Sequence, residues 1–246
     1  MAAEVRPGKV QDERLAEIMR RLDEAYGPHI WHRRTDPASE LILTILSQHT
    51  SDVNAHRAFQ SLLARFETLD RVMVADVPEI ANAIRSAGLA NVKAPRIKEV
   101  LGLIQKRRGS LDLEFLAELD LEQARTWLTK LPGVGPKTAA CVLLFSLGAP
   151  AMPVDTHVYR VARRLALFDP RTTPDQAHRI LEEMVPRNKV YDFHLNLIAH
   201  GRRICKAPIP ICPRCVIDSL CPKTGVDIVT VATRYHSGPD SAALAH

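Results

Sequence analysis

Residues 131–140 read LPGVGPKTAA, a stretch that turns sharply between two helical segments and so decides the fold class. A P-loop is excluded, because Pro136 separates Gly135 from Lys137 where that motif needs Gly-Lys followed by Ser or Thr. A dinucleotide-binding fingerprint is excluded, because no strand precedes the glycines and a third glycine is missing. The remaining pattern is helix, Gly-x-Gly turn, helix.

This turn is suited to binding an anion. Gly133 and Gly135 allow backbone conformations that other residues avoid and let a ligand approach closely. The helix that follows begins with free N–H groups, which favour negative charge. We therefore expect Gly133, Val134 and Gly135 to contact a DNA phosphate without sequence preference. A plain connector between two helices is the alternative.

Apolar residues at helical spacing continue on both sides of the turn, and β-branched alternating runs are rare. Gly (11 residues) is scarce and aromatic residues make up only 5%, a composition typical of helices. The many short helical segments favour a globular all-α fold over a coiled coil. The segment from Lys223 to His246 is expected to be a loosely ordered tail with one weak strand-like run, Val226–Val231. Helices are expected near residues 15–22, after 36–37, from 51–52, from 76–78, around 97–104 and over 121–130, 137–147, 155–167, 173–184 and 190–201.

Composition excludes several classes of protein. The 246 residues carry 33 Lys and Arg against 28 Asp and Glu, and this net charge of +5 permits nucleic acid as a partner. No apolar run is long enough for a membrane span, and the first residues lack the apolar region of a signal peptide. Five Cys are too few and too clustered for a disulfide scaffold.

Four of the cysteines have the spacing Cys205-x6-Cys212-x2-Cys215-x5-Cys221. A zinc site of four thiolates is usually built from two C-x2-C pairs, and only one pair has that spacing here. The longer gaps favour a [4Fe–4S] cluster, which needs one Cys per iron; zinc, unbound thiols or disulfides remain open. The fifth, Cys141, lies in an apolar helical stretch and is expected to be a small buried side chain.

Basic residues flank these cysteines, and they either face phosphate or solvate a surface loop. They are Arg202, Arg203, Lys206 and Arg214.

Two further residues could carry chemistry. Lys137 follows the turn directly, and a helix N-terminus in a basic groove shifts the pKa of an amine downward, as a nucleophile requires. A solvated surface amine is the alternative. Asp155, in the segment PVDTH of residues 153–157, is expected to be the N-cap of the next helix.

The turn, the segment VDTHVYR (154–160) and the four-cysteine loop occur here in one chain and in this order. Together they resemble the endonuclease III family of helix-hairpin-helix base-excision DNA glycosylases, over about residues 15–222. LTILSQHTSD (43–52), GLANVKA (88–94) and HGR (200–202) are also similar to family stretches. The resemblance implies a two-lobed all-α fold: a six-helix lobe over 29–144 with the hairpin, a cluster lobe from 1–28 with 145–222, and a tail over 223–246.

The same resemblance implies roles for single residues. Lys137 would be the Schiff-base nucleophile and Asp155 the catalytic carboxylate, brought together when DNA binds across a cleft between the lobes. Leu89 matches a wedge that enters the duplex beside the extruded nucleotide. The family usually has a Gln at the position of His49, whereas this chain has Gln48 one residue earlier, so either residue could fill the vacated space. Cluster ligands would be Cys205, Cys212, Cys215 and Cys221.

The activity implied is that of a bifunctional DNA glycosylase and AP lyase that removes oxidised pyrimidines from double-stranded DNA. A glycosylase for mismatched uracil or thymine and a non-catalytic metal-cluster DNA-binding protein are the alternatives. A monomer with a [4Fe–4S] cluster is expected, in a cytoplasmic compartment that keeps thiols reduced, associated with the nucleoid if the source is bacterial.

Overall fold

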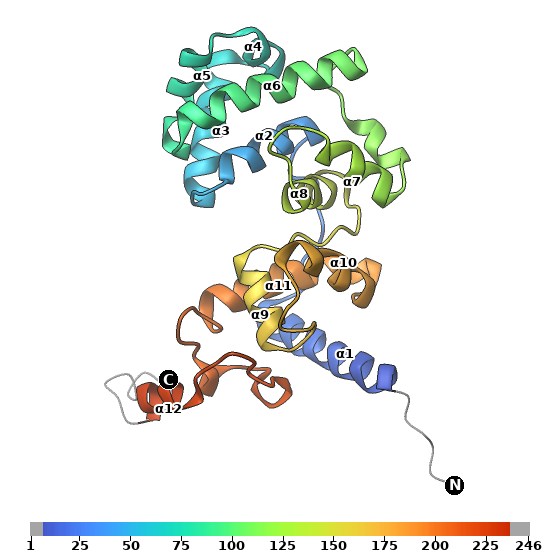
Figure 1. The fold of residues 1–246 in the computed structure, drawn as a ribbon, viewed down its shortest axis with the longest axis vertical. Helices are drawn as coiled ribbons and strands as arrows, with labels where there is room; N and C mark the ends of the chain where they lie inside the picture. Colours follow the sequence, from blue (N-terminus) through green and yellow to red (C-terminus); the bar gives the residue numbers. More distant parts are fainter. Residues whose placement is uncertain (1–6, 237–246) are drawn as a thin grey trace. The chain divides into compact units, whose positions relative to one another are not determined.

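The computed structural model describes residues 7–236, with side chains described for residues 12–235. Every regular element among these residues is a helix, so the expected all-α fold is confirmed. The chain divides into two compact units (Figure 1): Trp31–Pro153, and the segments before Trp31 and after Pro153. The six-helix lobe was predicted to end at residue 144, which lies inside the helix Pro136–Leu147. The unit that begins at Trp31 ends at Pro153, after that helix.

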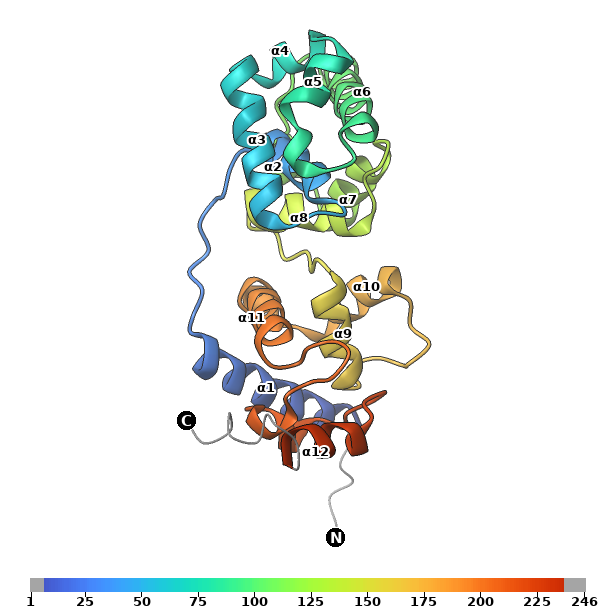
Figure 2. The same cartoon turned by 90° about the vertical axis from the view of Figure 1, so that its left-hand side faces the viewer.

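The unit Trp31–Pro153 is built around one helix that is apolar on nearly all faces. Residues 37–46 of α2 (Pro37–Ser47) are all buried, as this pattern requires. α3 (Asp52–Phe66) and α8 (Pro136–Leu147) pack against α2 (Figure 2). Glu40 of α2 is fully buried, and the Arg34 Nε atom donates to it at 2.8 Å, so this carboxylate is paired.

Shorter helices complete this unit. α4 (Leu69–Val74) and α5 (Val77–Ala83) both pack on α6 (Ala90–Arg108). The six-residue α4 was not expected from the sequence; Thr68 caps it by accepting from the Arg71 backbone N–H. The 3₁₀ turn η1 (Arg85–Ala87) leads into α6, and η2 (Glu114–Glu118) precedes α7 (Leu121–Thr129), which packs on α8.

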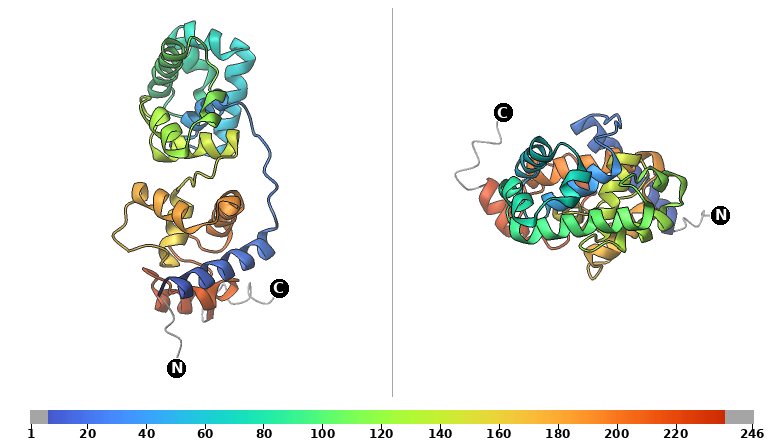
Figure 3. Two further views of the ribbon diagram at one scale, coloured as in Figure 1. Left: turned by 90° about the vertical axis from the view of Figure 1, so that its right-hand side faces the viewer. Right: turned by 90° about the horizontal axis from the view of Figure 1, so that it is seen from above.

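The second unit joins the two ends of the chain. α11 (Val190–Arg203) packs against both α1 (Pro7–Tyr26) and α9 (Thr156–Arg164), as Figures 2 and 3 show. α10 (Pro174–Met184) begins with a capping box and is followed by η3 (Arg187–Lys189). The four-cysteine loop follows α11 and contains only the two short turns η4 (Cys212–Arg214) and η5 (Asp218–Leu220).

The expectation of a loosely ordered tail from residue 223 is wrong for its first part. α12 (Ile228–His236) forms where a weak strand-like run was predicted. The Asp227 carboxylate accepts from the backbone N–H groups of Val229 and Thr230, which starts the helix. Val231 and Tyr235, four residues apart on one face, are buried. Residues 237–246 of the predicted tail lie outside the described residues.

No helix in the described part of the chain is long and apolar enough to cross a membrane.

Candidate active site and cysteine pocket

The Gly-x-Gly turn presents the start of α8. Gly133 has a φ of +72°, and Gly135 is the N-cap of α8 without a side-chain capping bond. A Cβ atom at Gly133 would overlap the end of the Arg96 side chain of α6, which is flexible and can move aside. The positive φ of Gly133 is therefore what favours glycine there. The turn leaves the first N–H groups of α8 without a capping side chain, and the Arg96 side chain lies beside Gly133.

Lys137 lies on the first turn of α8, and its side chain is exposed. The next residue, Thr138, is only 5% exposed and faces the interior of the unit. The helix thus fixes the main chain of Lys137 next to the turn while its amine remains open to a ligand.

Gln48 and His49 have different surroundings, although they are adjacent. The Gln48 Nε2 atom donates to the Gly133 carbonyl at 3.1 Å and to the Thr138 Oγ1 atom at 3.4 Å, so this amide ties the end of α2 to the turn. His49 is exposed and has a φ of +55°, which is uncommon for a residue other than glycine.

A second exposed residue with a left-handed backbone precedes α6. Leu89 has a φ of +50°, and 55% of it is exposed. Val92, one turn further on, is 57% exposed. Both apolar side chains are therefore more than half exposed.

Asp155 begins α9 in the other unit. Its Oδ1 atom accepts from the backbone N–H groups of His157 at 2.8 Å and Val158 at 2.7 Å, so the predicted N-cap role is confirmed. No described residue donates to its Oδ2 atom. The cap therefore fixes the carboxylate through one oxygen and leaves the other available.

Arg160 connects α9 to the end of α11, and the sequence did not mark it as functional. Its Nη2 atom donates to the Gly201 carbonyl and its Nε atom to the Cys205 carbonyl, both at 2.9 Å. A Cβ atom at Gly201 would lie 3.0 Å from the His157 Cβ atom, so a glycine allows the two helices to approach. This contact explains the Gly in HGR and links the helix of Asp155 to the first cysteine of the loop.

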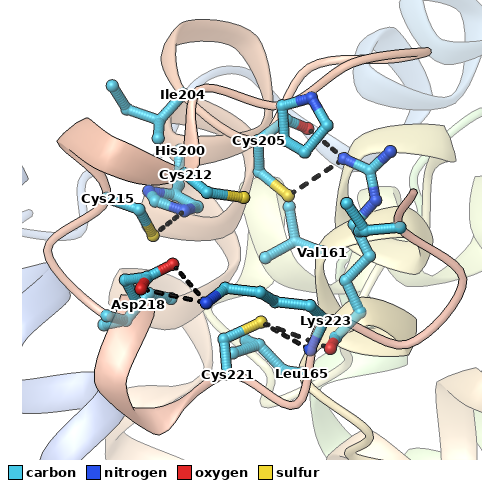
Figure 4. A pocket seen from close by; sticks show the side chains of 14 residues that line it. Val161, Leu165, His200, Ile204, Cys205, Cys212, Cys215, Asp218, Cys221 and Lys223 are labelled. Atoms are coloured by element: carbon cyan, nitrogen blue, oxygen red, sulfur yellow. Dashed lines mark hydrogen bonds and ion pairs between the residues drawn. The ribbon is translucent and has the colours of Figure 1, made fainter. Parts of the chain in front are cut away.

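The four predicted ligands line one pocket (Figure 4), which holds about 360 Å³ of space unfilled by atoms, part of it open to solvent. The pocket also contains apolar side chains, among them Val161, Leu165 and Ile204. No three His, Cys, Asp or Glu side chains in the described residues are arranged to hold a single ion. Thiolates are ligands of both zinc and iron–sulfur clusters. Lining cysteines are Cys205, Cys212, Cys215 and Cys221.

Hydrogen-bond donors surround these sulfur atoms. The Arg164 Nη1 atom lies 3.3 Å from the Cys205 sulfur, and the backbone N–H of Lys223 lies 3.4 Å from that of Cys221. Burial raises the pKa of the Cys215 thiol to about 12. A thiol with such a raised pKa stays protonated near pH 7 unless a metal centre binds its sulfur and displaces the proton.

His200 lies against the same pocket. Burial lowers the pKa of its imidazole to about 4, so the ring is neutral near pH 7. Its Nε2 atom lies 3.5 Å from the Cys215 sulfur and its Nδ1 atom 2.8 Å from the Tyr26 hydroxyl. A ring that donates from Nε2 accepts from Tyr26 at Nδ1, which orients it toward the sulfur.

The four predicted basic residues are all exposed around this loop. The guanidinium of Arg203 lies 5.6 Å from the centre of the Tyr26 ring. The set is Arg202, Arg203, Lys206 and Arg214. Cys141, in contrast, is 8% exposed within α8, as expected of a packing residue.

Comparison with known proteins identifies the class. Residues 42–187 match the family described as HhH-GPD superfamily base excision DNA repair protein. Endonuclease III of Thermotoga maritima is 34% identical over 190 residues, covering 77% of this chain and 84% of that protein. Endonuclease III of Escherichia coli K12 is 33% identical over 215 residues, covering 86% and 97%. An Arabidopsis thaliana protein named as a DNA glycosylase is 38% identical over 186 residues, but the match spans only 61% of that protein.

Comparison with solved structures points to the same class of protein. A non-covalent endonuclease III–DNA complex matches with a TM-score of 0.74 and 27% identity, over 86% of this chain and 95% of that one. A thermostable thymine-DNA glycosylase, at 24% identity and a TM-score of 0.70, has the same fold. The chain therefore belongs to the HhH-GPD superfamily of base excision DNA repair proteins. Within that superfamily it is an endonuclease III-like DNA glycosylase.

Proposed function

We propose that this protein is a bifunctional DNA glycosylase and AP lyase that removes oxidised pyrimidines from double-stranded DNA. The observation that carries the proposal is the exposed amine of Lys137 on the first turn of α8, directly after the Gly133–Gly135 turn. A phosphate bound at that turn would present the sugar–phosphate backbone to the amine. A glycosylase that uses water as the nucleophile has no need of an amine there.

The proposed reaction starts with extrusion of the damaged nucleotide, which costs less for a damaged base than for an intact pair. The bond between C1′ and the base breaks, the base leaves with a proton, and the Lys137 nitrogen bonds to C1′. The Asp155 carboxylate stabilises the positive charge that develops on the sugar and accepts the proton that Lys137 loses.

The second half of the reaction uses the imine that forms when the sugar ring opens. An imine at C1′ acidifies the C2′ proton. Loss of this proton moves its electron pair into a new C2′–C3′ double bond and expels the 3′ phosphate. Water then releases Lys137 from the unsaturated sugar. The strand is thus nicked 3′ to the abasic site, without an oxidant or reductant.

Two neighbouring turns would enter the duplex. Leu89, exposed on a left-handed turn, would be the wedge. We assign the space left by the extruded nucleotide to His49 and not to Gln48, because the Gln48 amide is engaged by Gly133 and Thr138 while His49 is exposed. An imidazole can donate or accept a hydrogen bond there, so the opposite base would influence activity.

A [4Fe–4S] cluster would be held by the four cysteines around the pocket of Figure 4. When bound, it would supply structural bonds to a loop with little core of its own. Arg164 and the Lys223 backbone N–H would donate to its sulfur ligands. The loop would then present its basic residues to DNA phosphates, in a monomer that works where thiols remain reduced and DNA is present.

The test combines a panel of lesions with imine trapping by borohydride. We expect cleavage of duplexes with an oxidised pyrimidine and a trapped covalent complex with abasic DNA. Lys137→Gln should lose trapping but still bind abasic DNA, because the turn and α8 remain. Lys130→Gln, an exposed lysine before the turn, is the control and should trap normally.

Trapping of Lys137→Gln at the wild-type level would overturn the assignment of the nucleophile. Cleavage of mismatched uracil or thymine in preference to oxidised pyrimidines would overturn the proposed substrate. Binding to abasic DNA without cleavage or trapping by the wild type would indicate a non-catalytic DNA-binding protein.

A further inference from the structure

Lys93 is a buried lysine whose amine joins two separate helical ends. Only 4% of the residue is exposed, near the start of α6. Its Nζ atom donates to the Leu46 carbonyl at 2.7 Å and to the Ala87 carbonyl at 2.8 Å. Leu46 is in the last turn of α2, and Ala87 ends η1. Carbonyls at such ends lack partners within the helix and carry partial negative charge, so a cation is favourable there.

These two carbonyls lie at the bases of the two exposed turns. Gln48 and His49 follow Leu46 almost directly, and Leu89 follows Ala87 after one glycine. His49 and Leu89 have φ values of +55° and +50°. A left-handed backbone is costly for residues other than glycine and persists only where the surroundings hold it. Among the described residues, Lys93 is the one side chain that donates to the segments before both of these turns.

Core packing alone gives little reason for an amine at this position. Taking an ammonium out of water is costly, and desolvation lowers the pKa of Lys93. An apolar side chain of similar length would fill the same space without that cost. The amine provides what an apolar side chain does not: two directed bonds that set the spacing between the end of α2 and the end of η1.

We propose that Lys93 is a positioning residue that holds the His49 turn and the Leu89 turn in one fixed relation, so that both enter damaged duplex DNA together. This inference rests on the proposed function, in which these two turns meet the duplex. Lys93 itself is buried below them and acts through their main chains. Its removal should therefore affect DNA that must be opened and spare DNA that is already single-stranded.

The same helix offers a matched control. The Lys98 Nζ atom donates to the Ala75 carbonyl at 2.5 Å and to the Val74 carbonyl at 3.4 Å, at the end of α4. It makes the same kind of bond from α6 but to a helix end that leads to neither turn. Lys98→Met thus removes an equivalent amine without disturbing the proposed positioning.

The experiment measures the rate of imine trapping on an abasic site in duplex and in single-stranded DNA. Lys93→Met should lower the ratio of duplex to single-strand rate about tenfold, the equivalent of one well-formed buried hydrogen bond, with the single-strand rate unchanged. Lys93→Gln, which keeps one donor to carbonyls, should fall between Lys93→Met and the wild type. Lys98→Met should keep the wild-type ratio.

A second arm needs binding only. In a duplex with 2-aminopurine opposite a tetrahydrofuran abasic analogue, the wild type should raise fluorescence by unstacking the probe, and Lys93→Met should raise it less at saturation. If the wild-type protein unstacks the probe but is not trapped, the proposed lyase function is wrong. The fluorescence of Lys93→Met relative to the wild type then tests the positioning role by itself. The positioning role would be overturned if Lys93→Met kept the wild-type rate ratio and fluorescence. It would also be overturned if the trapping rate fell equally on duplex and single-stranded DNA, or if both Lys93 variants unfolded.

Discussion

At the scale of single residues, side chains that bond to the main chain hold this site in place. Gln48 ties α2 to the Gly133 turn, Arg160 ties α9 to the cysteine loop, and Asp155 caps α9 with one oxygen. The cap needs only a side-chain oxygen at the start of the helix, whereas the proposed catalytic role needs the negative charge of the carboxylate. A substitution that keeps the oxygen and removes the charge therefore separates the two roles of Asp155.

Asp155→Asn should keep the fold and lose glycosylase activity. The Asn side-chain oxygen caps a helix about as well as that of Asp, so the melting temperature should remain near the wild-type value. The negative charge is lost, and single-turnover base release should fall by about 10²-fold or more. Asp155→Ala should lose the cap as well, at about 1 kcal/mol and a melting temperature about 2–4 °C lower.

Thr173→Ala is the control for the loss of a cap. Thr173 caps α10 by accepting from the Gln176 backbone N–H, so this change should lower the melting temperature by a similar amount and leave base release unchanged. Base release by Asp155→Asn at the wild-type rate would remove Asp155 from the proposed mechanism.

At the scale of elements, the sequence predicted what depends on local pattern. Most helices, the turn at Gly133–Gly135 and the cap at Asp155 follow from apolar spacing, glycines and capping residues in a short window. α12 was missed because Val226–Val231 is rich in β-branched residues, whereas the Asp227 cap and the burial of Val231 and Tyr235 favour a helix.

The contacts of Lys93, Arg96 and Arg160 could not be predicted, because each joins segments far apart in the sequence. The sequence also left open whether Gln48 or His49 fills the space that the extruded nucleotide vacates. The engagement of Gln48 within the protein depends on the carbonyl of Gly133, which only the packing of α2 on α8 brings near.

The loop over residues 205–221 carries the four cysteines that would hold the proposed cluster. Purified protein should absorb light at about 400 nm, as iron–sulfur proteins do, and Cys215→Ser should lose that absorbance. The variant loop should also become sensitive to proteolysis, because its two short turns bury little apolar surface. Cys141→Ala should retain the absorbance, since Cys141 is a packing residue in α8.

Iron and sulfide measured in the same samples complete this test. Wild-type protein that contains one zinc per chain and no iron would overturn the cluster proposal.

At the scale of the whole molecule, a net charge of +5 is a weak guide to DNA binding. Binding depends on where positive charge lies, because each neutralised phosphate releases counterions locally. Arg203 and Lys206 are exposed beside the cysteine loop. Arg20 is exposed on α1, where it forms ion pairs with Glu17 and Glu24. Replacing any one of these basic residues with Ala lowers the net charge by the same single unit.

If local phosphate contacts govern binding, the salt dependence of binding to an abasic-analogue duplex should differ among these variants. If net charge governs binding, it should change equally in all of them. Arg203→Ala and Lys206→Ala should each reduce the slope of log K against log salt by about 0.9, the value for one lost phosphate contact. Arg20→Ala should leave the slope at the wild-type value. An equal change in all three variants would mean that total charge governs binding, and an unchanged slope in Arg203→Ala or Lys206→Ala would remove that residue from the DNA-binding surface.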